Sequence, residues 1–125
     1  MSDKAFPKLV LVVDDEPAIQ KLMQIQLESF GYAVLLAATG GEAVETAKTA
    51  KVDVVFTDLG LPDINGLEVL KRIKAAKPAV PVIIVTGNHQ EEEGRRALEL
   101  GALEYLTKPI DFKYLKQILS LQFPA

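Results

Sequence analysis

Five short runs of hydrophobic residues recur along the chain, and each is followed by a stretch with helical spacing. The runs lie at residues 9–13, 34–37, 52–57, 81–86 and 104–107. The first, third and fourth are nearly continuous Val, Ile, Leu and Phe. Such runs are typical of strands that are buried on both faces of a parallel sheet, whereas a strand with one solvent face alternates between apolar and polar residues. We therefore expect five strands of a parallel sheet.

The stretches between these runs carry apolar residues at the spacing of amphipathic helices. We expect helices at residues 17–30, 41–49, 66–77 and 90–100, and a fifth from Asp111 to just before Pro124. Local signals support these bounds. Pro17 suits a first helical turn, Gly31 suits a C-terminal cap, and Asp111 suits an N-terminal cap. Pro78 ends the third helix and Gly101 ends the fourth.

Strands and helices thus alternate through the whole chain, which predicts an α/β fold with helices on both faces of the sheet. Right-handed crossovers and a single reversal of direction give the flavodoxin-like (βα)5 doubly wound arrangement, with strand order 2-1-3-4-5. The chain shows no linker and no repeat, so we expect one domain over residues 1–125, with residues 1–7 as a short N-terminal extension.

Composition narrows the class of protein. The chain has 125 residues, of which 49% are apolar and 25% charged, as in an ordinary globular domain. It has no cysteine, which excludes disulfides and thiolate metal sites. No apolar run approaches the roughly 20 residues of a membrane span, and the first residues do not form a signal peptide. These properties suit a cytoplasmic location, and the net charge of -3 argues against direct nucleic-acid binding.

Polar residues gather where four of the expected strands end. Asp14 and Asp15 follow the first strand, Asp58 the third, Thr86 ends the fourth and Lys108 follows the fifth. In the order 2-1-3-4-5 these four strands are neighbours, and ligands of such sheets bind at the carboxyl ends of the strands. Clustered carboxylates are the ligands that Mg²⁺ prefers, and an Asp carboxylate can act as a nucleophile toward phosphorus. The sequence therefore predicts a magnesium and phosphoryl-transfer site at this edge.

The chain resembles the receiver domain of two-component response regulators, the CheY-like superfamily, over nearly its whole length. The motifs that carry the resemblance are VVDDEP at 12–17, TDLGLPDINGLEVL at 57–70, VTG at 85–87 and GALEYLTKP at 101–109. Each motif alone would be moderate support, but four in the right order and on the expected strand ends are strong support.

The resemblance implies a phosphoacceptor and a metal site. Asp58 matches the residue that takes a phosphoryl group from the phosphohistidine of a sensor histidine kinase or a histidine phosphotransfer protein. Asp15, Asp58 and the backbone carbonyl of Gly60 would bind Mg²⁺ directly, and Asp14 would act through a metal-bound water. The domain would catalyse only its own phosphorylation and autodephosphorylation, so it is a signalling module rather than an enzyme with a separate substrate.

The resemblance also implies a switch. Lys108 would pair with a phosphoryl oxygen, Thr86 would turn its hydroxyl toward the phosphoryl group, and the Gly87 amide would assist. Tyr105 would change rotamer together with Thr86, and the readout surface would be helix 4, strand 5 and helix 5. The peptide bond before Pro109 would be cis, which X-Pro bonds permit.

Some of these residues also have purely structural interpretations. Pro62, Gly66, Gly87 and Pro109 are expected to shape the loops, with Gly87 permitting a close backbone approach. Tyr105 on a short edge strand is alternatively a half-exposed residue without a switching role. His89, the only histidine, is expected to be an exposed loop residue rather than a phosphorelay histidine. The acidic run at 91–93 is expected to complement a helix dipole rather than to bind a metal.

Three other functions stay open beside the receiver interpretation. A Mg²⁺-dependent phosphatase of the haloacid-dehalogenase type would carry D-x-D on strand 1 and usually a cap domain, whereas this chain has D-D-E at 14–16 and little room for a cap. The second alternative is a phosphorylation-independent adaptor with a receiver fold. The intact Asp58, Thr86 and Lys108 argue against this alternative. A flavin-binding protein would need a Gly- and Ser/Thr-rich phosphate loop where the acidic DDEPA stands.

The sequence leaves the signalling context open. The cognate kinase and the downstream protein target cannot be inferred from it, and the domain is either a stand-alone regulator or part of a longer one. We expect a monomer or a weak phosphorylation-dependent dimer, because the fifth helix lacks the pattern of the winged-helix transcription-factor receivers that dimerise through this surface.

Overall fold

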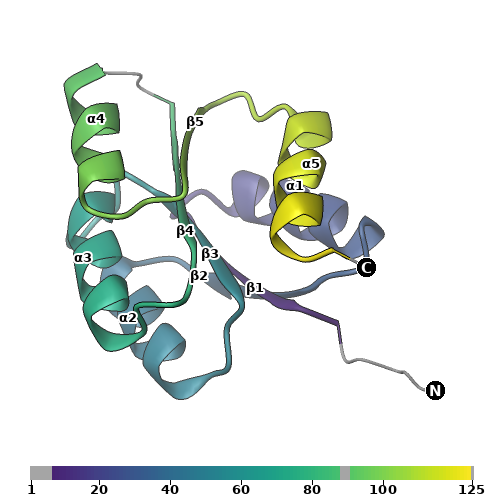
Figure 1. Cartoon of the computed structure of the whole chain (residues 1–125), viewed down its shortest axis with the longest axis horizontal. Coiled ribbons are helices and arrows are strands. Elements are labelled where there is room, and N and C mark those ends of the chain that lie inside the picture. Colours follow the sequence, from purple (N-terminus) through teal and green to yellow (C-terminus); the bar gives the residue numbers. More distant parts are fainter. Residues whose placement is uncertain (1–6, 88–90, 125) are drawn as a thin grey trace.

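The computed structural model describes residues 7–87 and 91–124. Strands and helices alternate along the chain (Figure 1). The strands are β1 (Leu9–Val13), β2 (Ala33–Ala37), β3 (Val54–Asp58), β4 (Val82–Thr86) and β5 (Glu104–Thr107). The helices are α1 (Pro17–Ser29), α2 (Gly40–Thr49), α3 (Gly66–Ala76), α4 (Glu91–Glu99) and α5 (Phe112–Gln122).

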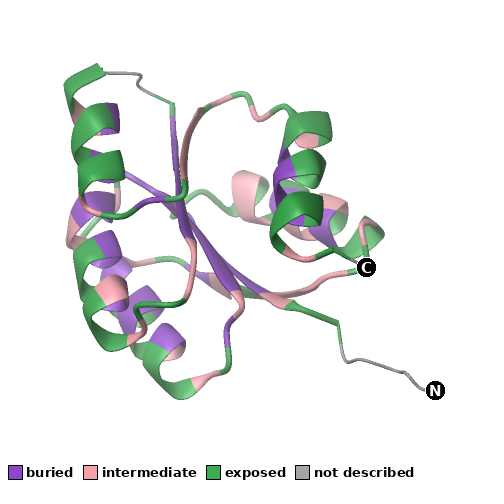
Figure 2. Cartoon of the chain, viewed as in Figure 1, coloured by how far each residue is buried: buried purple, intermediate pink, exposed green. Residues whose placement is uncertain are grey.

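The five strands form one parallel sheet in the order β2-β1-β3-β4-β5, which confirms the predicted flavodoxin-like topology. Helices α1 and α5 cover one face, and α2, α3 and α4 cover the other (Figure 1). The central strands are buried from end to end between these two layers (Figure 2). This explains why their sequences are hydrophobic without alternation.

Alternate residues of each strand enter two separate halves of the core. On β1 and β3, Val12 and Phe56 pack toward α1 and α5, whereas Leu11 and Val55 pack toward α2, α3 and α4. The two halves cover both faces of the sheet, so the sheet meets solvent at the ends of its strands and along the edge strands β2 and β5.

The local signals in the sequence work as expected. Pro17 begins α1, and Gly31 and Gly101 follow α1 and α4 with positive φ values of 97° and 102°, which favour glycine. The Asp111 carboxylate caps α5 by accepting hydrogen bonds from the backbone N–H groups of Lys113 and Tyr114.

The second and fourth strands begin one residue away from the expected start, at Ala33 and Val82, and the third strand differs more. We expected the third strand at residues 52–57, but β3 begins at Val54 and continues through Asp58. Val52 is buried in the core without joining the strand, and Asp58 is still in register with Val85 of β4. The hydrophobic run thus predicted which residues are buried but not which residues pair in the sheet. The expected bounds of the third strand, 52–57, were wrong at both ends.

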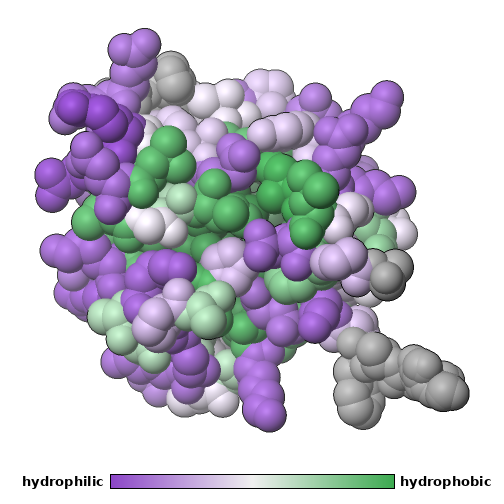
Figure 3. Space-filling model, viewed as in Figure 1, coloured by the Kyte–Doolittle hydropathy of each residue, from purple (hydrophilic) through white to green (hydrophobic). Residues whose placement is uncertain are grey.

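Three further observations concern the helices, the surface and the N-terminal residues. No helix within the described ranges is both long and apolar enough to span a membrane. The face that presents α4, β5 and α5 shows apolar groups between hydrophilic ones (Figure 3). The expected extension at residues 1–7 lies outside the described residues except for Pro7.

Candidate functional site

The parallel sheet brings the predicted site residues to one edge. Asp14 and Asp15 directly follow β1, Asp58 is the last residue of β3, and Thr86 is the last of β4. Lys108 follows β5, whose Thr107 is in register with Thr86. Since β1, β3, β4 and β5 are consecutive in the sheet, all five residues fall at the same end of neighbouring strands.

Three carboxylates form the centre of this site. Asp14, Asp15 and Asp58 each offer an oxygen, and these oxygens lie within 4.8 Å of one another. Asp14 is 3% exposed and Asp58 8% exposed, whereas Asp15 faces solvent. Three hard oxygen donors with one open side fit a cation such as Mg²⁺, which takes few protein ligands and keeps several waters.

The acidic run at the start of α4 does not form a second such site. Over the described ranges the three aspartates are the single cluster able to hold a metal. Glu91, Glu92 and Glu93 lie in the first turn of α4, and Glu92 forms an ion pair with Arg95 one turn later. This agrees with the expected role of complementing the helix dipole.

Lys108 is the cation of the site. Its Nζ lies 2.9 Å from Asp14 Oδ2, 3.2 Å from Asp58 Oδ2 and 3.6 Å from Glu16 Oε1. Its backbone N–H donates to the Thr86 carbonyl at 2.8 Å, which anchors the residue to the end of β4. The Lys108–Pro109 peptide bond is cis, as expected. A single ammonium therefore faces several carboxylates, and the site retains negative charge.

The pKa values reflect this imbalance. Burial raises the pKa of Asp58, and the charge of Asp14 adds to the increase, so that together they outweigh the opposing effects of Lys108 and the Gly60 N–H. Burial lowers the pKa of Lys108, but the carboxylates of Asp14 and Asp58 more than compensate, and the net pKa is raised. The ammonium is thus well paired, whereas the Asp58 carboxylate is disfavoured in its charged form and would gain from a second cation.

We expect Lys108→Met to destabilise the metal-free protein. Removing one member of a buried ion pair typically lowers the free energy of unfolding by 3–5 kcal/mol, and for this partly solvated lysine we expect about 2 kcal/mol. Urea unfolding in EDTA, followed by circular dichroism because the chain has no tryptophan, measures this value. Lys113→Met, at an exposed position on α5, is the matched control, and an equal effect of both changes would contradict the prediction.

Asp14 is held in place by its surroundings. Its backbone N–H donates to the Ala37 carbonyl, its Oδ1 accepts from the Glu16 N–H at 2.9 Å, and its carbonyl accepts from the Gln20 side chain at 2.7 Å. Its second carboxylate oxygen is thereby directed to Lys108.

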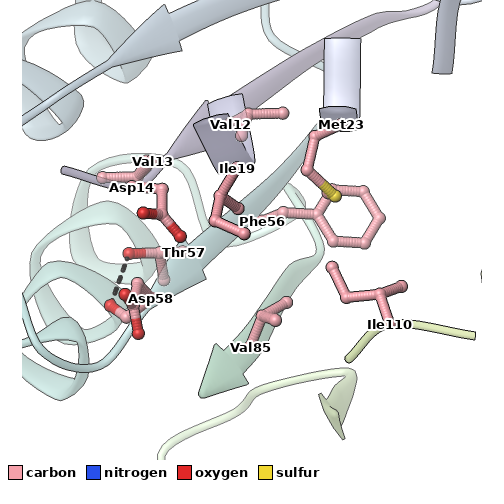
Figure 4. A pocket seen from close by; sticks show the side chains of 10 residues that line it. All are labelled: Val12, Val13, Asp14, Ile19, Met23, Phe56, Thr57, Asp58, Val85 and Ile110. Carbon is pink, nitrogen blue, oxygen red and sulfur yellow. Dashed lines mark hydrogen bonds between the residues drawn. The ribbon is translucent and has the colours of Figure 1, made fainter. Parts of the chain in front are cut away.

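A small gap lies beneath the carboxylates, between the sheet and α1. Figure 4 shows Asp14 and Asp58 at its polar end and Met23, Phe56 and Ile110 at its apolar end. The Thr57 hydroxyl donates to the Asp58 carbonyl here at 3.1 Å. The carboxylates therefore rest on an apolar base, which explains why burial raises the pKa of Asp58.

The loop between β3 and α3 forms another wall. The Gly60 N–H donates to Asp58 Oδ1 at 3.3 Å, and Asn65 caps α3 by accepting from two backbone N–H groups. A Cβ on Gly66 would lie 2.2 Å from the Asp58 carbonyl oxygen, so only glycine fits there. This supports the structural interpretation of Gly66. Pro62 lies within the same loop.

The structure gives no steric reason for glycine at position 87. A Cβ there would first meet Lys108 Cδ at 3.8 Å, which is an ordinary contact distance. The expected close backbone approach is therefore not found at Gly87, and its expected amide role stays a prediction. His89 lies outside the described residues.

A hollow opens beside Asp58 on the side of β4. Its lining includes Asp58, Gly60, Thr86 and Gly87, together with Glu93 from α4. Thr86 is 3% exposed, and it lies at the position where the sequence predicts a hydroxyl donor. The sequence did not single out Glu93 for this hollow, because its place within an acidic run gave no sign of which acid faces the site.

Tyr105 of β5 packs toward α4. A Cβ on Gly94 would lie 3.1 Å from the Tyr105 ring, and the Tyr105 hydroxyl oxygen is buried. The ring is half-buried as a whole and joins the core on the side of α2, α3 and α4. The inward position is one of the two rotamers that a switch would need, while the switching role itself stays a prediction.

Comparison with known proteins identifies the family. The family model described as "Response regulator receiver domain" matches residues 10–120. The chain belongs to the response regulator receiver family. A receiver domain is a signalling module, so this match decides against the phosphatase and the flavin-binding interpretations.

A curated relative agrees with the assignment. The alkaline phosphatase synthesis transcriptional regulatory protein PhoP of Bacillus subtilis is 42% identical over 102 residues, which are 82% of this chain and 42% of that protein. The receiver domain thus spans less than half the length of this curated relative.

Two solved structures are close to this receiver domain. One is the receiver domain of the sensor histidine kinase PA1611 from Pseudomonas aeruginosa PAO1, with a magnesium ion coordinated in the active site cleft; it has a TM-score of 0.85 and 30% identity, covering 95% of this chain and 99% of that one. The other is a response regulator from Burkholderia pseudomallei with a phosphorylated aspartic acid and a calcium ion, with a TM-score of 0.82 and 29% identity, covering 90% of this chain and 65% of that one.

Proposed function

We propose that this receiver domain accepts a phosphoryl group on Asp58 from a phosphohistidine of a sensor histidine kinase or a histidine phosphotransfer protein. The observation that carries the proposal is the set of three carboxylate oxygens within 4.8 Å of one another, with the Lys108 ammonium 3.2 Å from Asp58. The phosphorylated aspartate of the Burkholderia response regulator and the magnesium in the Pseudomonas receiver support it.

The transfer is a displacement at phosphorus. A carboxylate oxygen of Asp58 forms the new P–O bond, the P–N bond to the histidine breaks, and the electron pair returns to the imidazole nitrogen, which takes up a proton. In the separate hydrolysis step, the oxygen of a water forms a new bond to phosphorus, the P–O bond to Asp58 breaks, and inorganic phosphate and the free Asp58 carboxylate are released. Both steps concentrate negative charge on the transferring oxygens, so the site must supply cations and donors.

The residues of the site would share this task. Asp15, Asp58 and the Gly60 carbonyl would hold Mg²⁺ directly, and Asp14 would act through a metal-bound water. The ion would supply positive charge for the phosphoryl oxygens. Lys108, already 3.2 Å from Asp58, would move its ammonium to a phosphoryl oxygen. The Thr86 hydroxyl would donate from the other side of the hollow.

Phosphorylation would then bias two states of the α4, β5 and α5 surface. The new group adds roughly 1.5 to 2 negative charges at neutral pH, which gives Thr86 and Lys108 a new partner. Movement of Thr86 would change the space available to Tyr105 and so alter the surface that a downstream protein contacts. A cytoplasmic location and a monomer or weak phosphorylation-dependent dimer, without direct nucleic-acid binding, belong to the same proposal.

We expect one phosphoryl adduct when the protein is incubated with Mg²⁺ and acetyl phosphate. Intact mass spectrometry measures it, with an EDTA sample as the control in which the adduct is absent. A rapid-quench sample covers the case of fast hydrolysis. If the rapid-quench sample with Mg²⁺ also showed no adduct, the proposal would be wrong, and a phosphorylation-independent adaptor would take its place.

A further inference from the structure

The loop from Leu59 to Asn65 carries Gly60, the proposed backbone ligand of the metal, on an exposed position. A Cβ added to Gly60 would meet no atom within 4 Å, and the Gly60 N–H makes a long hydrogen bond of 3.3 Å to Asp58 Oδ1. The loop closes on itself through the Gly66 N–H, which donates to the Leu59 carbonyl at 2.8 Å. Local packing at Gly60 is therefore weak, and the loop needs an anchor elsewhere.

Asp63 provides a contact from this loop to a different helix. Its Oδ1 accepts from the Gly40 N–H and its Oδ2 from the Gly41 N–H, both at 2.8 Å. These N–H groups belong to the first turn of α2, where backbone donors have no partner within the helix and the helix dipole favours an anion. The same hydrogen bonds, from Gly41 first and Gly40 second, lower the pKa of Asp63 to about 2.

The start of α2 has a shape that matches the loop. A Cβ on Gly40 would lie 2.4 Å from Ile64 Cγ1 and 2.9 Å from Val69 Cγ2. A Cβ on Gly41 would lie 3.3 Å from Asp63 Oδ2. Glycine at both positions thus lets the loop approach the helix closely enough for both carboxylate oxygens to bond.

We propose that Asp63 is a positioning residue, which ties the loop of residues 59–65 to α2 and thereby holds the Gly60 carbonyl at the metal site. This inference rests on the proposed function, since it requires Mg²⁺ to bind at Asp15, Asp58 and Gly60. Asp63 itself contacts neither the metal nor the phosphoryl group; it acts through the backbone between residues 60 and 63.

Thr39 offers a matched control on the same helix. Its side chain caps α2 by accepting from the Glu42 N–H at 3.1 Å. Thr39→Ala removes a cap from α2 as Asp63→Ala does, but it leaves the tie to the loop intact. If Asp63 acted only on the stability of α2, the two variants would affect Mg²⁺ binding equally. If Asp63 positions the loop, Asp63→Ala would weaken Mg²⁺ binding and Thr39→Ala would not.

We expect Asp63→Ala to weaken Mg²⁺ binding roughly tenfold, the lower end of the loss seen when residues that orient metal ligands are changed. Isothermal titration calorimetry with MgCl₂ measures the Kd, and we expect Thr39→Ala to stay within about twofold of the wild type because it leaves the ligands in place. Amide hydrogen exchange of residues 59–65 in EDTA is a second, metal-free readout, and it should accelerate in Asp63→Ala but not in Thr39→Ala. Asp63→Asn, which keeps one acceptor oxygen, should fall between Asp63→Ala and the wild type.

The outcomes separate this inference from the proposed function. A wild type that binds no Mg²⁺ would overturn both. A wild type that binds Mg²⁺, with an unchanged Kd in Asp63→Ala, would overturn the inference alone. Equal weakening by Asp63→Ala and Thr39→Ala would also overturn it, because helix stability would then explain the effect. If Asp63→Ala does not fold, the Mg²⁺ Kd and the amide exchange of residues 59–65 are measured for Asp63→Asn instead and compared with Thr39→Ala. Unchanged values in Asp63→Asn would then overturn the inference.

Discussion

Asp58→Asn is expected to abolish the phosphoryl adduct completely and, in EDTA, to raise the thermal stability of the fold. The adduct is lost because an amide cannot serve as the nucleophile toward phosphorus. The stability rises because the pKa of Asp58 is raised in the folded protein, so its charge opposes folding at neutral pH. The uncharged Asn keeps the shape of the side chain without that charge.

Two measurements check this pair of effects. Intact mass after acetyl phosphate treatment reports the adduct, and the Tm in EDTA reports stability. Asp111→Asn is the matched control, since it makes the same chemical change at an exposed helix cap where Asn is an equally good residue. An adduct that survives in Asp58→Asn would place the phosphorylation on another residue, and a lower Tm would mean that the ion pair with Lys108 outweighs the burial of the charge.

Gly66→Ala is expected to lower the free energy of unfolding by about 3 kcal/mol or more. Overpacking typically costs roughly 1–3 kcal/mol, and this contact is severe enough for the upper end of that range. The new Cβ would lie 2.2 Å from the Asp58 carbonyl oxygen and 2.9 Å from Leu59 Cα, and neither backbone atom can rotate away. Helix propensity alone predicts the opposite sign, because Ala is favoured over Gly in a helix by roughly 0.5–1 kcal/mol. Gly66 has no positive φ, so steric crowding is the deciding effect.

Urea unfolding followed by circular dichroism measures the change. Gly60→Ala is the control within the same loop, because nothing lies within 4 Å of its new Cβ, and its stability should change little. A stabilised Gly66→Ala protein would show that the backbone of β3 yields at this point. The position of Asp58 at the end of β3 would then be less fixed than the hydrogen bonds of the loop indicate.

The order of the elements could be predicted because it depends on periodicity and short signals. Continuous hydrophobic runs, such as residues 9–13, mark strands that are covered on both faces, and Pro17 and Gly31 mark a helix start and end. The bounds of β3 were less predictable. Val52 is buried without pairing, and Asp58 pairs although it is polar, so hydrophobicity and hydrogen bonding disagree at both ends of this strand.

The site could be predicted in part. Asp14, Asp15, Asp58 and Lys108 share an edge because parallel strands end together, and this follows from strand order alone. The contact of Asp63 with α2 depends on how closely a loop approaches a helix, which no periodic pattern encodes. Two adjacent glycines at residues 40 and 41 were the available signal, since a helix start without side chains leaves room for another segment.

The ion pair between Lys108 and Asp14 joins residues that are 94 positions apart in the chain. During synthesis on a ribosome, the acidic residues that follow β1 emerge long before the lysine that will pair with them. Until β5 has been made and has joined the sheet, the nascent chain carries these carboxylates without their ammonium. Formation of this ion pair and completion of the sheet are therefore one event, and a chain whose synthesis stops before Lys108 would carry the acidic half of the site alone.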